Sequence, residues 1–173
     1  MQHLNIEIKA RCDDLDAIRS ILQDHDAECI GEDRQIDTYF CVAEGRLKLR
    51  EGSIERSLIH YLRPDQAGPK PSTVTRYEPD APGALKAVLS AALGIWVVVD
   101  KRREIYFIDN VKFHLDRVDG LGTFVEIEAI GQDTSADPEA LHVQCQQYME
   151  RFGLSEDALV PASYSDLLHR SQR

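Results

Sequence analysis

Most of the chain alternates between apolar and polar residues with a period of two, which is the pattern of half-buried β-strands. In residues 4–11, Ile6 and Ile8 share one face of the predicted strand, while Glu7 and Lys9 share the other. The same alternation predicts further strands at residues 35–42, 46–50, 57–63, 72–78, 95–107, 111–118 and 123–130. Proline and glycine predict a loop at residues 65–71, and Asp119-Gly120 starts a hairpin turn.

Three stretches break this alternation and carry apolar residues at helical spacing. The first follows an acidic pair at residues 13–14 and places Leu15, Ile18 and Leu22 on one side. The other two begin near residues 82 and 137, each beside a proline, a residue favoured in the first helical turn. We therefore expect an α+β protein dominated by antiparallel sheet. The pattern fits a closed barrel and a sandwich equally well.

Length and charge narrow the class of protein. A chain of 173 residues favours one domain, spanning 1–173. Its 20 Lys and Arg against 30 Asp and Glu give a net charge of -10, which argues against a general nucleic-acid or acidic-membrane surface. No apolar run reaches the roughly 18 residues of a membrane span, and residues 1–9 lack a signal-peptide pattern. The four cysteines lack metal or redox spacing, so we expect free thiols and a cytoplasmic protein.

The charged faces of the predicted strands are segregated by sign. Lys48 and Arg50 share one face of their strand, whereas Glu126 and Glu128 share a face with Phe124 and apolar neighbours. A charged strand face usually points to solvent, and solvated faces tend to mix signs. A carboxylate pair among apolar residues fits better on the inner wall of a closed barrel, where charged faces converge on a polar lumen.

Such a lumen suits a polyphosphate bound with a divalent metal. Lysines and arginines from several strands supply the many donors that a polyphosphate requires. Two carboxylates two residues apart on a strand lie about 6.6 Å apart at their Cα atoms and can jointly hold hard cations. A cation such as magnesium would neutralise phosphate charge and polarise the reacting phosphorus. The sequence has no P-loop, no GxGxxG motif and no readable Ser-His-Asp arrangement.

Five stretches in order resemble the CYTH superfamily, also called triphosphate tunnel metalloenzymes. They are NIEIK at 5–9, which is similar to the family's ExExK strand, QIDTYF at 35–40, GRLKLRE at 45–51, VDKRR at 99–103 and LDRVDGLGTFVEIE at 115–128. ExExK alone is weak, but the ordered set is specific and covers nearly the whole chain. The resemblance is nearest to the CyaB-like branch, the class IV adenylate cyclases. It implies an eight-stranded antiparallel β-barrel with flanking helices, whose tunnel holds a triphosphate with Mg²⁺ or Mn²⁺.

The resemblance also implies roles for individual residues. It gives the metal to Glu7, Glu126 and Glu128, with Glu78 and Asp116 as further candidates that are equally plausible as salt-bridge partners. The expected triphosphate clamp comprises Lys9, Lys48, Arg50, Arg63, Lys101 and Arg103, with Lys9, Arg50 and Arg103 acting in catalysis. Arg11, Arg46 and Arg76 are further substrate-binding candidates near strand ends. We expect His114 to be a hydrogen-bonded barrel histidine and Trp96 to serve packing.

Asn5 departs from the family pattern, because it stands where the first glutamate of ExExK is expected. A neutral amide supplies no charge, so the number of metals at that end is left open. Three functions fit the sequence. The first is conversion of ATP to cyclic AMP and pyrophosphate; the second is hydrolysis of tripolyphosphate, thiamine triphosphate or a nucleoside triphosphate. The third is a non-catalytic polyphosphate- or nucleotide-binding module. Leu167-Leu168 hints at a homodimer.

Overall fold

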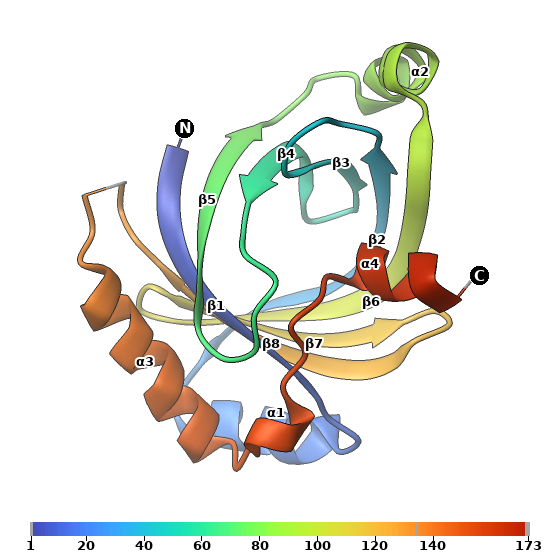
Figure 1. Ribbon diagram of the computed structural model, residues 1–173. Helices are drawn as coiled ribbons and strands as arrows, with labels where there is room; N and C mark the ends of the chain where they lie inside the picture. The colour runs from blue at the N-terminus through green and yellow to red at the C-terminus, as the bar shows by residue number, and fades with distance from the viewer. Residues whose placement is uncertain (1, 134, 172–173) are drawn as a thin grey trace.

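The strands of the protein form a closed antiparallel barrel, and not a sandwich (Figure 1). The computed structural model describes residues 2–133 and 135–171. Within them the strands are β1 (Gln2–Arg11), β2 (Glu28–Phe40), β3 (Arg46–Glu51), β4 (Arg56–Leu62), β5 (Lys70–Tyr77), β6 (Ile95–Ile108), β7 (Val111–Val118) and β8 (Gly122–Ile130). Their order around the barrel is β1-β5-β4-β3-β2-β6-β7-β8, and β8 pairs with β1 to close it.

The three predicted helices are present, and a fourth was not predicted. The predicted helices are α1 (Leu15–Asp24), α2 (Pro82–Leu93) and α3 (Pro138–Arg151). The fourth is α4 (Tyr164–Ser171), which follows the short 3-10 helix η1 (Glu156–Ala158). Asp14 and Asp137 cap α1 and α3 through their side chains, as acidic N-caps do. β2 begins at Glu28, well before the predicted residue 35, and β5 begins at Lys70, inside the predicted loop. No described helix has the length and apolar character needed to cross a membrane.

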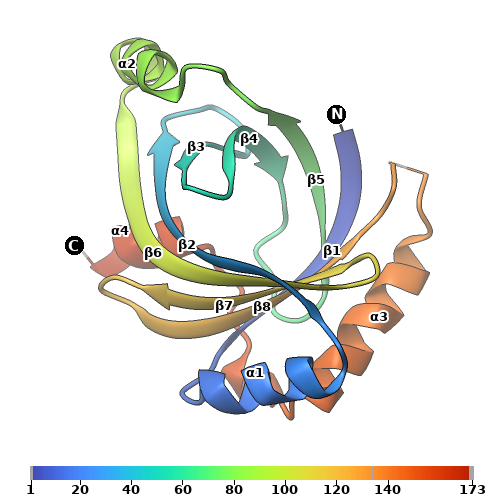
Figure 2. The ribbon, with the colours of Figure 1, turned by 180° about the vertical axis from the view of Figure 1, so that it is seen from behind.

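The larger hydrophobic core lies outside the barrel, between its wall and two helices. The outward faces of β1, β7 and β8 pack against α1 and α3, which lie along the same side of the barrel (Figure 2). Ile8, Phe113 and Ile127 on the strands are buried there with Leu22 of α1 and Cys145 of α3. Because side chains alternate across a strand, burying this face outward leaves the opposite, charged face of the same strands to line the lumen.

A second apolar cluster joins the C-terminal segment to one end of the barrel. Val97, Val99 and Phe124 pack there with Val160 and Tyr164, and α4 lies beside β6 (Figure 1). The buried Lys70 side chain fixes the same segment, because its Nζ donates to the carbonyl oxygens of Val160 and Pro161 at 3.3 and 3.0 Å. The chain therefore brings Ser163 and Tyr164 to the lumen, although they lie far in sequence from the strands.

Candidate active site

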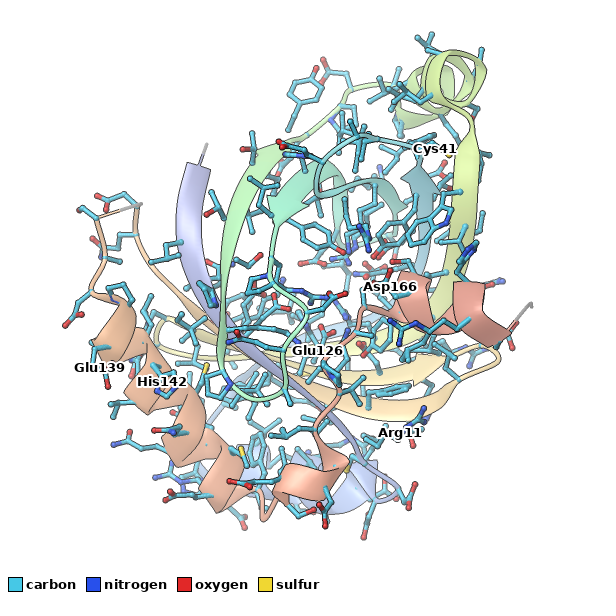
Figure 3. All side chains as sticks on the ribbon, in the orientation of Figure 1. Arg11, Cys41, Glu126, Glu139, His142 and Asp166 are labelled. Atoms are coloured by element: carbon cyan, nitrogen blue, oxygen red, sulfur yellow. The ribbon has the colours of Figure 1, made fainter. Side chains whose placement is uncertain are left out.

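The lumen contains a cavity that charged side chains line from nearly every strand. Its lining cations are Lys9, Lys48, Arg50, Arg63, Arg76, Lys101, Arg103 and Lys112. Its lining carboxylates are Glu7, Asp37, Glu55, Glu126 and Glu128. Cations thus outnumber carboxylates among the described lining residues, so the cavity has the electrostatic character of a polyanion site. Glu126 lies inside the barrel in Figure 3.

Asp37 on β2 joins three of the predicted clamp residues. Its carboxylate accepts from Lys48 Nζ at 3.0 Å, from Lys101 Nζ at 2.7 Å and from Arg50 Nε at 2.8 Å. Burial alone would raise the pKa of Asp37, but the charges of Arg50 and Lys101 outweigh it and hold the pKa well below its ordinary value. Asp37 is therefore an internal counterion that keeps these cations extended into the lumen.

Lys101 has an unusual charge balance for a clamp residue. Only 2% of it is exposed, and burial lowers its pKa to about 7. Asp37 opposes this shift, whereas the neighbouring cations Arg50, Arg103 and Lys48 reinforce it. A bound polyanion would favour the charged ammonium, so the protonated fraction of Lys101 would increase when an anionic ligand binds.

Glu126 on β8 forms a second junction at the other wall of the cavity. It is paired with Lys9 Nζ at 3.1 Å and with Arg103 Nη2 at 2.8 Å, and His114 Nδ1 lies 3.0 Å from its Oε2. Burial raises the pKa of Glu126, but Lys9 and Arg103 outweigh it, so the pKa lies well below the usual range. Glu126 is consequently ionised and oriented by three residues from β1, β6 and β7.

Asp116 lies behind the cavity and holds Arg103 in place. Arg103 Nε donates to its Oδ1 at 2.7 Å, and the Tyr164 hydroxyl donates to its Oδ2 at 2.7 Å. Asp116 is fully buried and is not among the cavity-lining residues, so the structure places it in its ion-pair role. A paired guanidinium fixed from behind keeps its remaining donors directed at a ligand.

The sequence analysis gave no role to three charged lining residues, Asp37, Lys112 and Glu55. Lys112 Nζ donates to Glu55, whose carboxylate also accepts from Arg50 Nη1 at 2.8 Å. Lys112 alternates with His114 and Asp116 on β7, so the period of two could have revealed it. Glu55 lies in the connection between β3 and β4, where no strand period points inward.

The carboxylates of β1 and β8 fit a hard divalent cation. Glu7 of β1 and Glu128 of β8 are directly opposite in the strand register, and Glu126 lies two residues before Glu128 on the same strand. Within residues 2–133 and 135–171, Glu128 forms no ion pair, and the Asn5 amide donates to its Oε1. Burial, Glu7 and Glu126 raise the pKa of Glu128 despite the opposing charge of Lys112. Uncompensated carboxylate oxygens of this kind are the ligands that Mg²⁺ and Mn²⁺ prefer.

The candidate metal ligands are not gathered around one point. Across the described ranges, no three His, Cys, Asp or Glu side chains surround a common point suited to a metal ion. Glu7 and Glu126 instead contact Arg63 and Lys9. A cation bound by these glutamates would compete with the lysine and the arginine for the carboxylate oxygens.

Several predicted residues lie away from the cavity. Glu78 follows the end of β5, and its carboxylate lies 3.5 Å from Arg76 Nη2 with 75% of its side chain exposed. Arg11 is exposed outside the barrel (Figure 3), where it donates to the Leu121 carbonyl oxygen at 3.1 Å. β5 ends at Tyr77, one residue before Glu78. Arg11 is paired in register with Phe124 of β8, and its guanidinium carbon lies 4.9 Å from the centroid of the Phe124 ring.

Arg46 lies at one mouth of the barrel and not among the lining residues of the main cavity. Its Nη2 donates to Asp166 of α4 at 2.7 Å, and its guanidinium lies 4.9 Å from the Trp96 ring centroid. Figure 3 shows Asp166 beside the barrel, at the start of α4. Trp96 packs against Tyr39 and His169, as expected for a packing residue.

His114 is only partly satisfied by its surroundings. Its Nδ1 contacts the ionised Glu126, while its Nε2 is buried and has no hydrogen-bond partner in the described part of the chain. Burial and the charge of Arg103 lower its pKa to about 4, so the ring is neutral at physiological pH. When Nδ1 carries the proton toward Glu126, the unpaired Nε2 is an acceptor.

Comparisons with known proteins agree with this architecture. The family model of the CYTH domain matches residues 3–164. The chain is 28% identical over 174 residues to adenylate cyclase CyaB of Aeromonas hydrophila, covering 96% of this chain and 89% of that protein.

Solved structures share the fold. A protein of Pyrococcus horikoshii superposes with a TM-score of 0.81 at 27% identity, over 94% of this chain and 98% of its own. A putative adenylate cyclase of Vibrio parahaemolyticus gives a TM-score of 0.71 at 21% identity, over 95% and 97% of the two chains. A putative adenylyl cyclase of Hippeastrum, described as having a dominant triphosphatase activity, gives 0.60 at 19% identity, over 98% and 96%.

Proposed function

Because the chain belongs to the CYTH domain family, we propose that it is a metal-dependent enzyme that converts ATP to cyclic AMP and pyrophosphate. The observation that carries this proposal is the convergence of Lys48, Lys101 and Arg103 with the glutamates of β1 and β8 in one closed lumen. The similarity to the CyaB adenylate cyclase over 96% of the chain supports the choice of ATP and of cyclisation.

The cations of the lumen would act on the triphosphate chain. Arg50 and Arg103 present planar guanidinium groups held by Asp37 and Asp116, and such groups bind phosphate oxygens in pairs. Lys9 of β1 and Lys101 of β6 add point charges from two strands that are not neighbours in the barrel. Attack of the 3′-hydroxyl on the α-phosphorus takes place within one ATP molecule, and fixing the triphosphate at several points would hold the two groups in the orientation that the reaction requires.

In the reaction, the 3′-hydroxyl oxygen of ATP bonds to the α-phosphorus while the bond to the bridging oxygen of pyrophosphate breaks. The hydroxyl proton leaves to water, and negative charge develops on the departing pyrophosphate. Preorganised Lys and Arg donors stabilise that charge, because they are already oriented before the reaction begins. Glu7, Glu126 and Glu128 would hold Mg²⁺ or Mn²⁺, which supplies Lewis-acid polarisation of the phosphoryl oxygens.

Product analysis tests the proposal. The purified protein is incubated with ATP, thiamine triphosphate and tripolyphosphate in parallel, each with Mg²⁺ and with Mn²⁺, and the products are separated by chromatography. Cyclic AMP with an equal amount of pyrophosphate from ATP is the expected result. Orthophosphate without cyclic AMP would replace the cyclase by a triphosphatase, and binding without any turnover would indicate a non-catalytic module.

A further inference from the structure

One wall of the cavity differs in chemistry from the rest. β4 and β5 present Ile59, Tyr61 and Val74 to the lumen, with Ser72 beside them. Tyr61 and Val74 are paired across the two strands, and Ile59 is paired with Arg76. No carboxylate of β4 or β5 lines the cavity, whereas β1 and β8 contribute Glu7, Glu126 and Glu128. Apart from Arg76 of β5, the wall is therefore apolar and aromatic, whereas most of the remaining lining residues are charged.

The apolar wall faces the phosphate-binding cations across the barrel. In the closed strand order, β5 lies four positions from β6, which carries Lys101 and Arg103. β4 likewise lies four positions from β7, which carries Lys112. Figure 1 shows β5 and β6 on opposite sides of the barrel. A ligand held by the cations of β6 would thus direct its remaining parts toward Ile59 and Val74.

Two of these residues, Ile59 and Val74, belong to neither hydrophobic core cluster, whereas Tyr61 packs against the second cluster. Val74 keeps partial exposure on the cavity side, as do Tyr61 and Ile130. A bare inorganic triphosphate gains no hydrogen bond from such side chains. An apolar group that covered them would gain hydrophobic contact.

We infer that Ile59, Tyr61 and Val74 bind the organic group of a nucleoside triphosphate and so discriminate it from inorganic triphosphate. This inference rests on the proposed function, because it takes the triphosphate chain to be held by the lumen cations. The Tyr61 ring offers a flat surface to a base or ribose, and Val74 and Ile59 extend that surface along the wall. Specificity for an organic substrate then depends on β4 and β5, while affinity for phosphate depends on the other strands.

Calorimetric titration of one substitution with two ligands tests the inference. The ligands are an ATP analogue with methylene-bridged phosphates and the corresponding methylene-bridged inorganic triphosphate, each with Mg²⁺. Val74→Ala removes two carbon atoms from the wall and is expected to weaken the ATP analogue about fivefold or more. The inorganic analogue should change by less than about twofold, since it does not contact the apolar wall.

Val98→Ala is the matched control, because Val98 is exposed outside the main cavity on β6 and loses the same atoms. It should leave both affinities unchanged. Circular dichroism checks that each variant is folded. If Val74→Ala is unstable, Val74→Thr repeats the test, because threonine keeps the shape of valine but has a hydroxyl in place of one methyl group.

The outcomes separate this inference from the function on which it rests. Equal weakening of both analogues by Val74→Ala, or no change in either, would overturn the apolar subsite but leave a triphosphate-binding enzyme. Binding of the inorganic analogue alone by the unsubstituted protein would overturn both the apolar subsite and the use of ATP, and would leave an inorganic triphosphate site. Failure of both ligands to bind the unsubstituted protein would remove the proposed function as well.

Discussion

Lys101 Nζ donates to Asp37 Oδ2 at 2.7 Å, and both side chains are almost completely buried inside the barrel. The same carboxylate also binds Lys48 and Arg50. One anion therefore compensates three cations from two strands, β3 and β6, before any ligand is present. Such a junction favours folding, because like charges would otherwise repel inside the lumen, and it keeps the cations in position for phosphate.

Replacing Asp37 by Asn should destabilise the fold. The substitution leaves three buried cations without their shared anion, and breaking a buried ion pair costs about 3–5 kcal/mol of the free energy of unfolding. Urea denaturation monitored by circular dichroism measures the loss. Added tripolyphosphate should recover part of it, because ligand binding stabilises the folded state.

The control for this substitution is Asp100→Asn. Asp100 pairs with the exposed Arg34, so the expected loss is about 1 kcal/mol or less. If Asp37→Asn costs no more than the control, Asp37 does not serve as the internal counterion.

Lys101 should make triphosphate binding depend on pH. In the free protein its pKa is lowered to about 7, and a polyanion would raise it, so the bound state holds more protons than the free state. Binding above pH 7 must therefore take up protons, and affinity should fall by up to about tenfold per pH unit as the pH rises. Calorimetry at pH 8 in two buffers with different ionisation enthalpies measures the uptake directly.

Lys101→Met removes the titrating group while keeping the length of the side chain. It should weaken binding and abolish most of the proton uptake at pH 8. Uptake that persists in this variant would assign the titration to another group and contradict the role of Lys101.

The local pattern of the sequence predicted the strands well because each strand carries its own alternation. The positions of β1, β7 and β8 agree with the prediction because one face of each strand packs against a helix. The ordered family motifs further implied the closed barrel, which the structure confirms. Alternation alone left open whether the charged face pointed to the lumen or to solvent, since closure depends on pairing between β1 and β8, more than a hundred residues apart.

Lys112 was missed although it follows the alternation of β7, but other parts that were missed lack a local pattern. α4 is only eight residues long, and packing against β6 and the cluster around Tyr164 stabilises it more than its own sequence does. Glu55 reaches the lumen from a connection, so its role follows from Arg50 and Lys112 and not from spacing. Glu78 was expected near the metal because it alternates with Arg76, but β5 ends at Tyr77.

Glu126→Gln should impair both metal binding and turnover. The neutral amide cannot compensate Lys9 and Arg103 and is a weaker ligand for a hard cation, so we expect activity to fall by roughly a hundredfold or more. Cyclic AMP formation and Mn²⁺ binding, followed by electron paramagnetic resonance, measure the two effects. Glu78→Gln is the control, because Glu78 is exposed outside the cavity and should retain full activity. Undiminished activity in Glu126→Gln would exclude Glu126 from the metal site.

Asn5→Glu should lower the stability of the metal-free protein and increase the stabilisation that a bound metal provides. Asn5 is buried, and its amide donates to the Glu128 carboxylate. A glutamate there would place a further negative charge beside Glu7 and Glu128, so the metal-free protein should lose about 1–3 kcal/mol of unfolding free energy. A bound cation would relieve that repulsion, and Mn²⁺ should therefore raise the melting temperature more in Asn5→Glu than in the unsubstituted protein.

Asn5→Gln separates this charge effect from the effect of side-chain length. Glutamine has the shape of glutamate without its charge, so any strain from the extra methylene appears equally in both variants. Thermal unfolding with EDTA and with increasing Mn²⁺ compares them. If the two variants melt alike under both conditions, charge at position 5 does not govern the metal site. If only Asn5→Glu shows the larger response to Mn²⁺, the amide at this position limits how strongly the carboxylates of β1 and β8 bind a cation.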